Sequence, residues 1–138
     1  MVGDALSEAV IGACMEVHRH LGPGLFESVY EECLCHELEL RAIGCERQVG
    51  VPVVFKGLEL ALAFRIDLVV EDRLILELKS VEQLLPIHFA QLRTYLRLSH
   101  FDAGLIVNFN VARLKQGIRR LETNYGFLPL TSPPPHLP

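Results

Sequence analysis

The sequence lacks a hydrophobic run long enough to cross a membrane. A transmembrane helix needs about 20 consecutive apolar residues, and polar or charged side chains interrupt every apolar stretch of the 138-residue chain well before that length. The first residues, Met-Val-Gly-Asp, also lack the basic segment followed by an apolar segment that is typical of a secretion signal. We therefore expect a cytoplasmic protein without a membrane partner.

The sequence also lacks paired CxxC spacing among its four cysteines. Without that spacing, and without a secretion signal, we expect reduced thiols rather than disulfides. A zinc site is the less favoured alternative, because the spacing of the available ligands differs from that of the common structural sites. The residues concerned are Cys14, Cys33, Cys35 and Cys45, of which Cys33 and Cys35 could bind zinc with His36 and either His18 or His20.

Positive charge is nearly absent from the first 40 residues, where Arg19 stands against eight acidic side chains. Residues 41–87 are close to balanced, and residues 88–120 carry six basic side chains against Asp102. This basic segment could meet a polyanion such as nucleic acid. The plainer alternative is that the charges lie on two solvated helix faces.

Half of the residues are hydrophobic and no internal repeat is visible, so the chain can build one core. We expect a single domain over residues 1–126 and a frayed, proline-rich tail over 127–138. Periodicity and turn residues predict the order ααβββαβα, an α/β (α+β) fold in which helices flank a mixed β-sheet. The predicted helices span residues 4–20, 27–41, 87–99 and 111–122, and the predicted strands span residues 47–55, 58–70, 74–79 and 103–109.

Three charged residues interrupt two of the predicted apolar strands: Asp67 in the first, and Glu77 and Lys79 in the second. Alternate residues of a strand share a face, so Glu77 and Lys79 point the same way. A buried carboxylate without a partner is costly. The pattern therefore predicts a metal site, a catalytic site or a buried ion cluster.

The turn between these strands decides whether the two carboxylates meet. A three-residue loop at 71–73 would place Asp67 opposite Glu77 on the same face, whereas a two-residue loop at 71–72 would send them to opposite faces. The turn contains no glycine. The sequence thus permits the three-residue loop without requiring it.

Further polar candidates lie on the predicted helices. Gln91 and Tyr95 are four residues apart and share a helix face, which His88 could join. Glu27 lies in the first turn of its helix, where a carboxylate also has the simple role of complementing the helix dipole. Taken alone, Gln91 and Tyr95 are more typical of an ordinary helix surface, and Lys79 of a solvated strand end.

Several of these residues fall into ordered motifs. The stretch Gly24-Leu25-Phe26-Glu27-Ser28-Val29-Tyr30 fits G-x-x-E-x-x-Y, Asp67 fits a motif aspartate, and Glu77-Leu78-Lys79 fits E-x-K. Gln91 and Tyr95 fit the Q-x-x-x-Y motif of RecB-type and lambda-exonuclease-type nucleases. Over residues 5–122 the chain thus resembles the GxxExxY protein family, which is similar to the PD-(D/E)XK nuclease superfamily. Ile66 occupies the proline position of the superfamily's motif, a departure that removes no functional group.

The resemblance implies a nuclease that depends on Mg²⁺ or Mn²⁺. Asp67 and Glu77 would bind the metal, with Glu27 and the carbonyl oxygen of Leu78 as further ligands. Lys79 would orient or help to deprotonate the attacking water, or stabilise the transition state.

The resemblance also implies a nucleic-acid substrate, with DNA favoured. Gln91 and Tyr95 would position the lysine, a carboxylate or the nucleic-acid backbone. A homodimer or a partner protein could supply substrate affinity that this acidic chain lacks. The alternatives are a catalytically silent binding module on the same fold and a purely structural ion cluster. The candidate phosphate contacts are Arg93, Arg97, Arg113 and Lys115, with Arg119 and Arg120 in addition.

Overall fold

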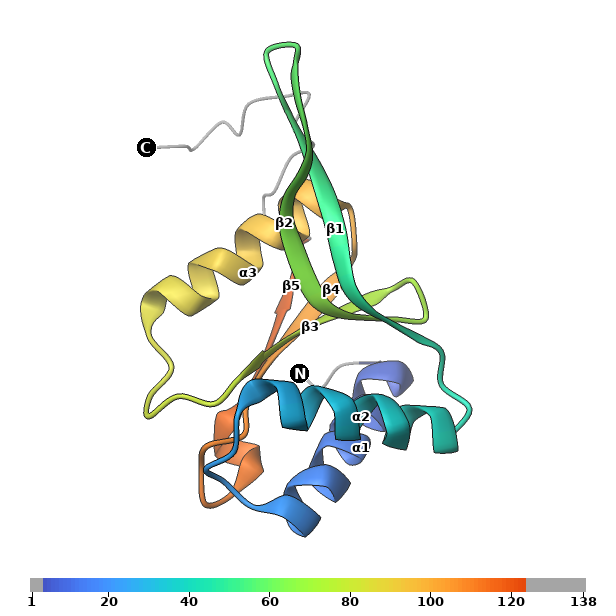
Figure 1. The fold of residues 1–138 in the computed structure, drawn as a ribbon, viewed down its shortest axis with the longest axis vertical. Coiled ribbons are helices and arrows are strands. Elements are labelled where there is room, and N and C mark those ends of the chain that lie inside the picture. The colour runs from blue at the N-terminus through green and yellow to red at the C-terminus, as the bar shows by residue number, and fades with distance from the viewer. Residues whose placement is uncertain (1–3, 124–138) are drawn as a thin grey trace.

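The computed structural model describes residues 4–123. Within that range the chain forms three α-helices, five strands and one short 3₁₀ helix (Figure 1). The elements are α1 (Ala5–Leu21), α2 (Glu27–Leu40), β1 (Cys45–Phe55), β2 (Leu58–Val70), β3 (Leu74–Lys79), α3 (Pro86–Ser99), β4 (Ala103–Asn108), η1 (Leu114–Gly117) and β5 (Ile118–Glu122).

The five strands form one mixed sheet in the order β1-β2-β3-β4-β5. Neighbouring strands are antiparallel except for β3 and β4, which α3 connects and which are parallel. Helices α1 and α2 lie against one side of the sheet and α3 against the other (Figure 1). The predicted mixed sheet flanked by helices is therefore confirmed.

Local chemistry explains where the first helix begins and ends. Asp4 caps α1, because its side chain accepts a hydrogen bond from the Ser7 backbone N–H at 2.9 Å. The helix ends at Gly22, whose φ of 70° lies in a region that favours glycine.

The middle of the sheet is buried on both faces. Nearly every residue of β3 and β4 is buried, as the continuous apolar runs of parallel strands require. Leu74, Leu76 and Leu78 pack against α1 and α2 in one core cluster, and Ile75 packs under α3 in the other. Because side chains alternate, Glu77 and Lys79 follow Ile75 onto the α3 side.

The hairpin of β1 and β2 extends beyond the body of the molecule as a two-stranded arm (Figure 1). Strand β2 pairs with β3 only over Leu68–Val70, so most of its length pairs with β1 alone. Apolar side chains of the arm, including Phe55, Leu58 and Leu60, are exposed. Asp67 lies where the arm joins the sheet.

The predicted closing helix over residues 111–122 is wrong. Residues 114–117 form the 3₁₀ helix η1, and Ile118–Glu122 form β5, which pairs antiparallel with β4. The three-residue spacing of Ile118 and Leu121 resembled a helix face, but in a strand it sends the two side chains to opposite sides of the sheet. Ile118 packs against the α1–α2 cluster and Leu121 against the α3 cluster, and β5 pairs the otherwise open edge of β4.

The tail predicted at 127–138 lies outside the described residues. None of the helices within residues 4–123 combines the length with the apolar character that a membrane crossing would need.

Candidate functional site

The turn between β2 and β3 has the three-residue form that brings the motif carboxylates together. Val70 pairs with Leu74 and Leu68 with Leu76, so the loop consists of residues 71–73. Glu71 and Asp72 close it with φ values of 53° and 54°, without a glycine. This register confirms the three-residue loop.

The two strands separate immediately beyond the Leu68–Leu76 pair, and the carboxylates occupy this fork. Asp67 reaches across it with its side chain, because Oδ2 accepts a hydrogen bond from the Leu78 backbone N–H at 2.8 Å. Glu77 reaches back, because its Oε2 accepts a longer bond from the Asp67 backbone N–H at 3.4 Å. Asp67 and Glu77 are thus neighbours, each held by a backbone group of the opposite strand.

Burial makes these carboxylates hard to ionise. Glu77 is only 6 % exposed, and its burial, together with the negative charge of Asp67, raises its pKa to about 8. Burial also raises the pKa of Asp67, with a further contribution from the charge of Glu31, against the lowering effect of the Leu78 N–H. A nearby cation would reverse both shifts.

Lys79 supplies one positive charge on this face. Its charge lowers the pKa of both Asp67 and Glu77, although burial outweighs it. Within residues 4–123 the Lys79 ammonium makes neither an ion pair nor a hydrogen bond, and it is half-buried. The ammonium is therefore near the acidic pair without being bound to either member.

The G-x-x-E-x-x-Y stretch folds into the turn and first helical residues that carry Glu27 to the end of β3. Gly24 has a φ of 99°, which favours glycine. Glu27 Oε2 accepts a hydrogen bond from the Ser80 backbone N–H at 3.2 Å, and the Ser80 hydroxyl donates to the Leu25 carbonyl oxygen at 2.5 Å. Glu27 thus holds the residue after Lys79, and its charge contributes to the raised pKa of Glu77.

Tyr30 anchors this turn from inside the core. It is fully buried and stacks on Phe109 with ring centroids 4.3 Å apart. Its hydroxyl donates to the Gly22 carbonyl oxygen at 2.5 Å and accepts from the Leu25 backbone N–H at 3.2 Å. The motif tyrosine therefore fixes the loop that places Glu27.

Tyr30→Phe is expected to destabilise the protein by about 1–3 kcal/mol, because it leaves the Gly22 carbonyl and the Leu25 N–H without their partner while preserving the stacked ring. Urea unfolding of both proteins measures this difference. The control is Tyr95→Phe, whose ring stacks on Phe64 but whose hydroxyl makes no hydrogen bond to another described residue. Equal stability of wild type and Tyr30→Phe would contradict the anchoring role.

Helix α3 brings Tyr95 to the acidic pair. The Tyr95 ring stacks on Phe64 with centroids 4.2 Å apart, and its pKa is raised by burial and by the charges of Glu77 and Asp67. Gln91 is exposed one turn earlier on the same helix. His88 has a structural task, because its Nδ1 accepts a hydrogen bond from the Leu85 backbone N–H at 3.0 Å and caps the helix.

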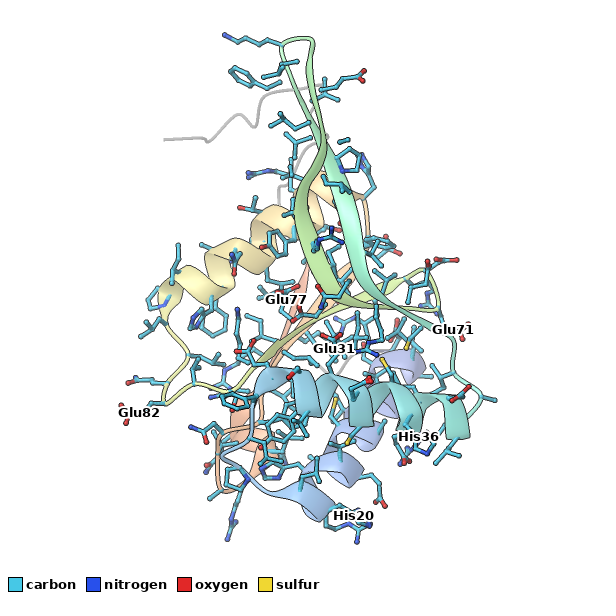
Figure 2. All side chains as sticks on the ribbon, in the orientation of Figure 1. His20, Glu31, His36, Glu71, Glu77 and Glu82 are labelled. Atoms are coloured by element: carbon cyan, nitrogen blue, oxygen red, sulfur yellow. The ribbon has the colours of Figure 1, made fainter. Side chains whose placement is uncertain are left out.

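Three residues near the fork were not predicted from the sequence. Glu31 and Gln48 form a hydrogen-bonded chain to Asp67; Glu31 follows Glu27 by one helical turn, and this spacing was the available signal. Asn108 is 2 % exposed and binds both the N–H and the carbonyl of Val81, which fixes the loop after Lys79. Figure 2 labels Glu31 on α2 and Glu77 on β3, both in the central part of the view.

The basic candidates occupy several surfaces. Arg93, Arg113 and Lys115 are exposed, and Arg97 is half-buried on α3. Arg120 has structural partners, because its guanidinium donates to the Ser7 hydroxyl at 3.0 Å and pairs with Glu122. The Arg120 guanidinium is therefore already bound within the fold. Contact of the other basic candidates with phosphate stays a prediction.

A divalent cation fits the donors at the fork. Asp67 and Glu77 offer hard oxygen ligands, and burial raises the pKa of both carboxyl groups despite the charge of Lys79, so a bound cation would favour their ionised forms. Among the described residues, no group of three or more His, Cys, Asp or Glu side chains is arranged to hold a metal. Two carboxylates nevertheless suit Mg²⁺, which usually keeps several waters and takes one or two protein carboxylates together with substrate phosphates.

That same finding leaves Glu27 and the cysteines outside any preformed metal cage in the described chain. Glu27 binds the Ser80 N–H instead, so its role as a ligand stays a prediction. The zinc alternative gains no support from the geometry, since the Cys35 thiol lies 3.5 Å from that of Cys45 and no group with Cys33 and His36 is formed within residues 4–123.

No curated protein matches the chain, and no solved structure matches it. The sequence model of the PD-(D/E)XK nuclease superfamily matches residues 4–121, which include the whole fork and the helices around it. Members of this superfamily are generally nucleases, which supports a nuclease-type, hydrolytic function and a nucleic-acid substrate. The chain belongs to the PD-(D/E)XK nuclease superfamily.

Proposed function

We propose that the protein is a nuclease that hydrolyses phosphodiester bonds, with DNA as the favoured substrate and Mg²⁺ or Mn²⁺ as the cofactor. Asp67 and Glu77 would hold the metal, with the Leu78 carbonyl and Glu27 as further candidate ligands. One observation carries the proposal: at the fork Asp67, which is half-buried, and Glu77, which is buried, are neighbours with raised pKa values, and Lys79 lies on their face without an ion pair to any residue within 4–123.

The side chains divide the chemistry among them. A bound divalent cation would supply Lewis acidity, which neutralises phosphate charge and eases deprotonation of water. The Lys79 ammonium would orient the attacking water or stabilise the charge that develops on the phosphate in the transition state. Tyr95 and Gln91 would position the lysine, a carboxylate or the backbone of the substrate.

Substrate affinity would come mainly from outside the acidic fork. Arg93, Arg97, Arg113 and Lys115 are the proposed phosphate contacts, because basic side chains supply most of the binding energy for a nucleic-acid backbone. The chain as a whole carries a net charge of −4. A second copy of the chain or a partner protein would therefore strengthen binding.

A cleavage assay with a matched pair of isosteric variants tests the proposal. The wild type should nick or degrade DNA when Mg²⁺ or Mn²⁺ is present, and Asp67→Asn should lose this activity by about 100-fold or more while remaining folded, because an amide is a poor ligand for a hard cation. Asp72→Asn removes the same charge from the exposed turn of the same hairpin and should retain activity. Equal cleavage by wild type and Asp67→Asn would contradict the site assignment.

A catalytically silent binding module is the second candidate. It is favoured by one observation, that no third carboxylate joins Asp67 and Glu77 in the described chain. Calorimetry with Mn²⁺ separates the two candidates, since a silent module should show no metal binding that depends on Asp67 and Glu77.

A further inference from the structure

One buried carboxylate beside the fork takes no part in the proposal above. Glu31 on α2 is 8 % exposed. Its Oε2 accepts a hydrogen bond from Arg47 Nε at 3.0 Å, and its Oε1 accepts one from Gln48 Nε2 at 2.9 Å. A buried carboxylate needs such partners, because without them its desolvation is costly. Both carboxylate oxygens of Glu31 thus accept a hydrogen bond.

Gln48 connects this carboxylate to the fork. It stands on β1 between the Arg47–Leu68 and Val49–Ile66 pairs, and so lies opposite Asp67. Its Nε2 also donates to Asp67 Oδ1, at 3.4 Å. The amide nitrogen carries two hydrogens, which match its two carboxylate partners.

The backbone of Gln48 is strained. Its φ of 51° lies in the left-handed region, which is unfavourable for a residue with a long side chain. Strain of this kind persists only where the surrounding structure imposes it, and it is concentrated at functional sites. Here the strained residue carries the amide that reaches two carboxylates.

We propose that Gln48 and Glu31 are positioning residues for Asp67, an inference that rests on the proposed metal site. Arg47 holds Glu31, Glu31 holds the Gln48 amide, and the amide holds Oδ1 of Asp67 while the Leu78 N–H holds Oδ2. The amide also lies between two carboxylates that would repel each other. Asp67 is thereby fixed in orientation for a cation, and Glu31 is kept from becoming a ligand itself.

The chain offers a matched control on the neighbouring residue. Glu32 accepts hydrogen bonds from the same guanidinium, with Arg47 Nη1 at 2.8 Å and 3.1 Å from its two oxygens. Its side chain is 58 % exposed, and it stands outside the path from Glu31 to Asp67. Glu31→Gln and Glu32→Gln therefore remove the same charge from the same arginine, but only the first disturbs Gln48, because glutamine has one acceptor oxygen where two are needed.

Mn²⁺ affinity measured by calorimetry is the first readout. Gln48→Gly and Glu31→Gln should weaken binding by about 10- to 100-fold, the range found when groups that orient metal ligands are removed, and Glu32→Gln should change it by less than about twofold. Equal losses in Glu31→Gln and Glu32→Gln would overturn the proposal. So would loss of all binding in Glu31→Gln, as in Asp67→Ala, because Glu31 would then be a ligand.

A second readout needs no metal. In chelator, the shift in melting temperature caused by Gln48→Gly is compared in the wild-type and Asp67→Ala backgrounds. If Gln48 holds Asp67, Gln48→Gly costs the wild type a hydrogen bond that the Asp67→Ala protein does not have. The change in melting temperature should therefore be more positive, by about 2 °C or more, in the Asp67→Ala background. Equal shifts would overturn the positioning role. If the wild type binds no Mn²⁺, the proposed metal site fails, and this comparison still decides whether the network holds Asp67.

Discussion

Replacing Lys79 with methionine should slow DNA cleavage by about 100- to 1000-fold, the usual effect of removing one preorganised charge from a transition state. Methionine keeps much of the apolar stem and removes only the ammonium beside Asp67 and Glu77. Because that ammonium makes no ion pair with a described residue, the melting temperature should change little. Single-turnover cleavage with saturating Mg²⁺ measures the effect on the chemical step.

Two further lysine variants make this result specific. Lys56→Met removes the same charge from the tip of the exposed arm, at the opposite end of the β1–β2 hairpin from the fork, and should leave the cleavage rate unchanged. Lys79→Arg keeps the charge in a different shape and should recover part of the rate. Cleavage by Lys79→Met at the wild-type rate would exclude the lysine from the mechanism.

Glu77→Gln should make the metal-free protein more stable at pH 8 while removing its response to metal. The folded-state pKa of Glu77, about 8, lies above its ordinary value of 4.5. Between these values the folded protein binds more protons than the unfolded chain, so the free energy of unfolding decreases as the pH rises. The stabilisation that comes from protonated Glu77 is complete below pH 4.5 and is lost by about pH 8. Over this range the free energy of unfolding falls by up to about 1.4 kcal/mol per pH unit.

Urea unfolding in chelator from pH 5 to pH 9 measures this slope. The slope should be shallower in Glu77→Gln, because an amide does not titrate, and unchanged in Glu59→Gln on the exposed arm. Adding Mn²⁺ should raise the stability of the wild type at pH 8 by favouring the ionised carboxylates, but should not do so in Glu77→Gln. Parallel pH profiles for wild type and Glu77→Gln would show that Glu77 is not the group that titrates.

The fold was predictable wherever one local pattern determined the structure. The breaks around Gly22 and Pro86 and the apolar runs of β2, β3 and β4 give the elements within one or two residues. The last element was not predictable in this way. Ile118 and Leu121 fit a helix face equally well, and only the open edge of β4, a feature of the assembled sheet, decides for a strand.

The candidate site shows the same division. Asp67, Glu77 and Lys79 stand out in the sequence because each interrupts an apolar strand, and the structure places the two carboxylates together through a loop whose length the sequence left open. Neither Glu31 nor Gln48 interrupts an apolar strand in this way. Glu31 is one of several glutamates on α2, and the strained φ of Gln48 is visible only when β1 is paired with β2.

Anomalous diffraction from crystals soaked in Mn²⁺ would show whether Asp67 and Glu77 bind a metal at the fork. We expect one Mn²⁺ at the fork of β2 and β3, bound by a carboxylate oxygen of Asp67 and one of Glu77, with the Lys79 ammonium on the same face. Absence of Mn²⁺ from the fork at a concentration that saturates the protein in calorimetry, or Mn²⁺ bound elsewhere while Asp67 and Glu77 remain unliganded, would contradict this expectation.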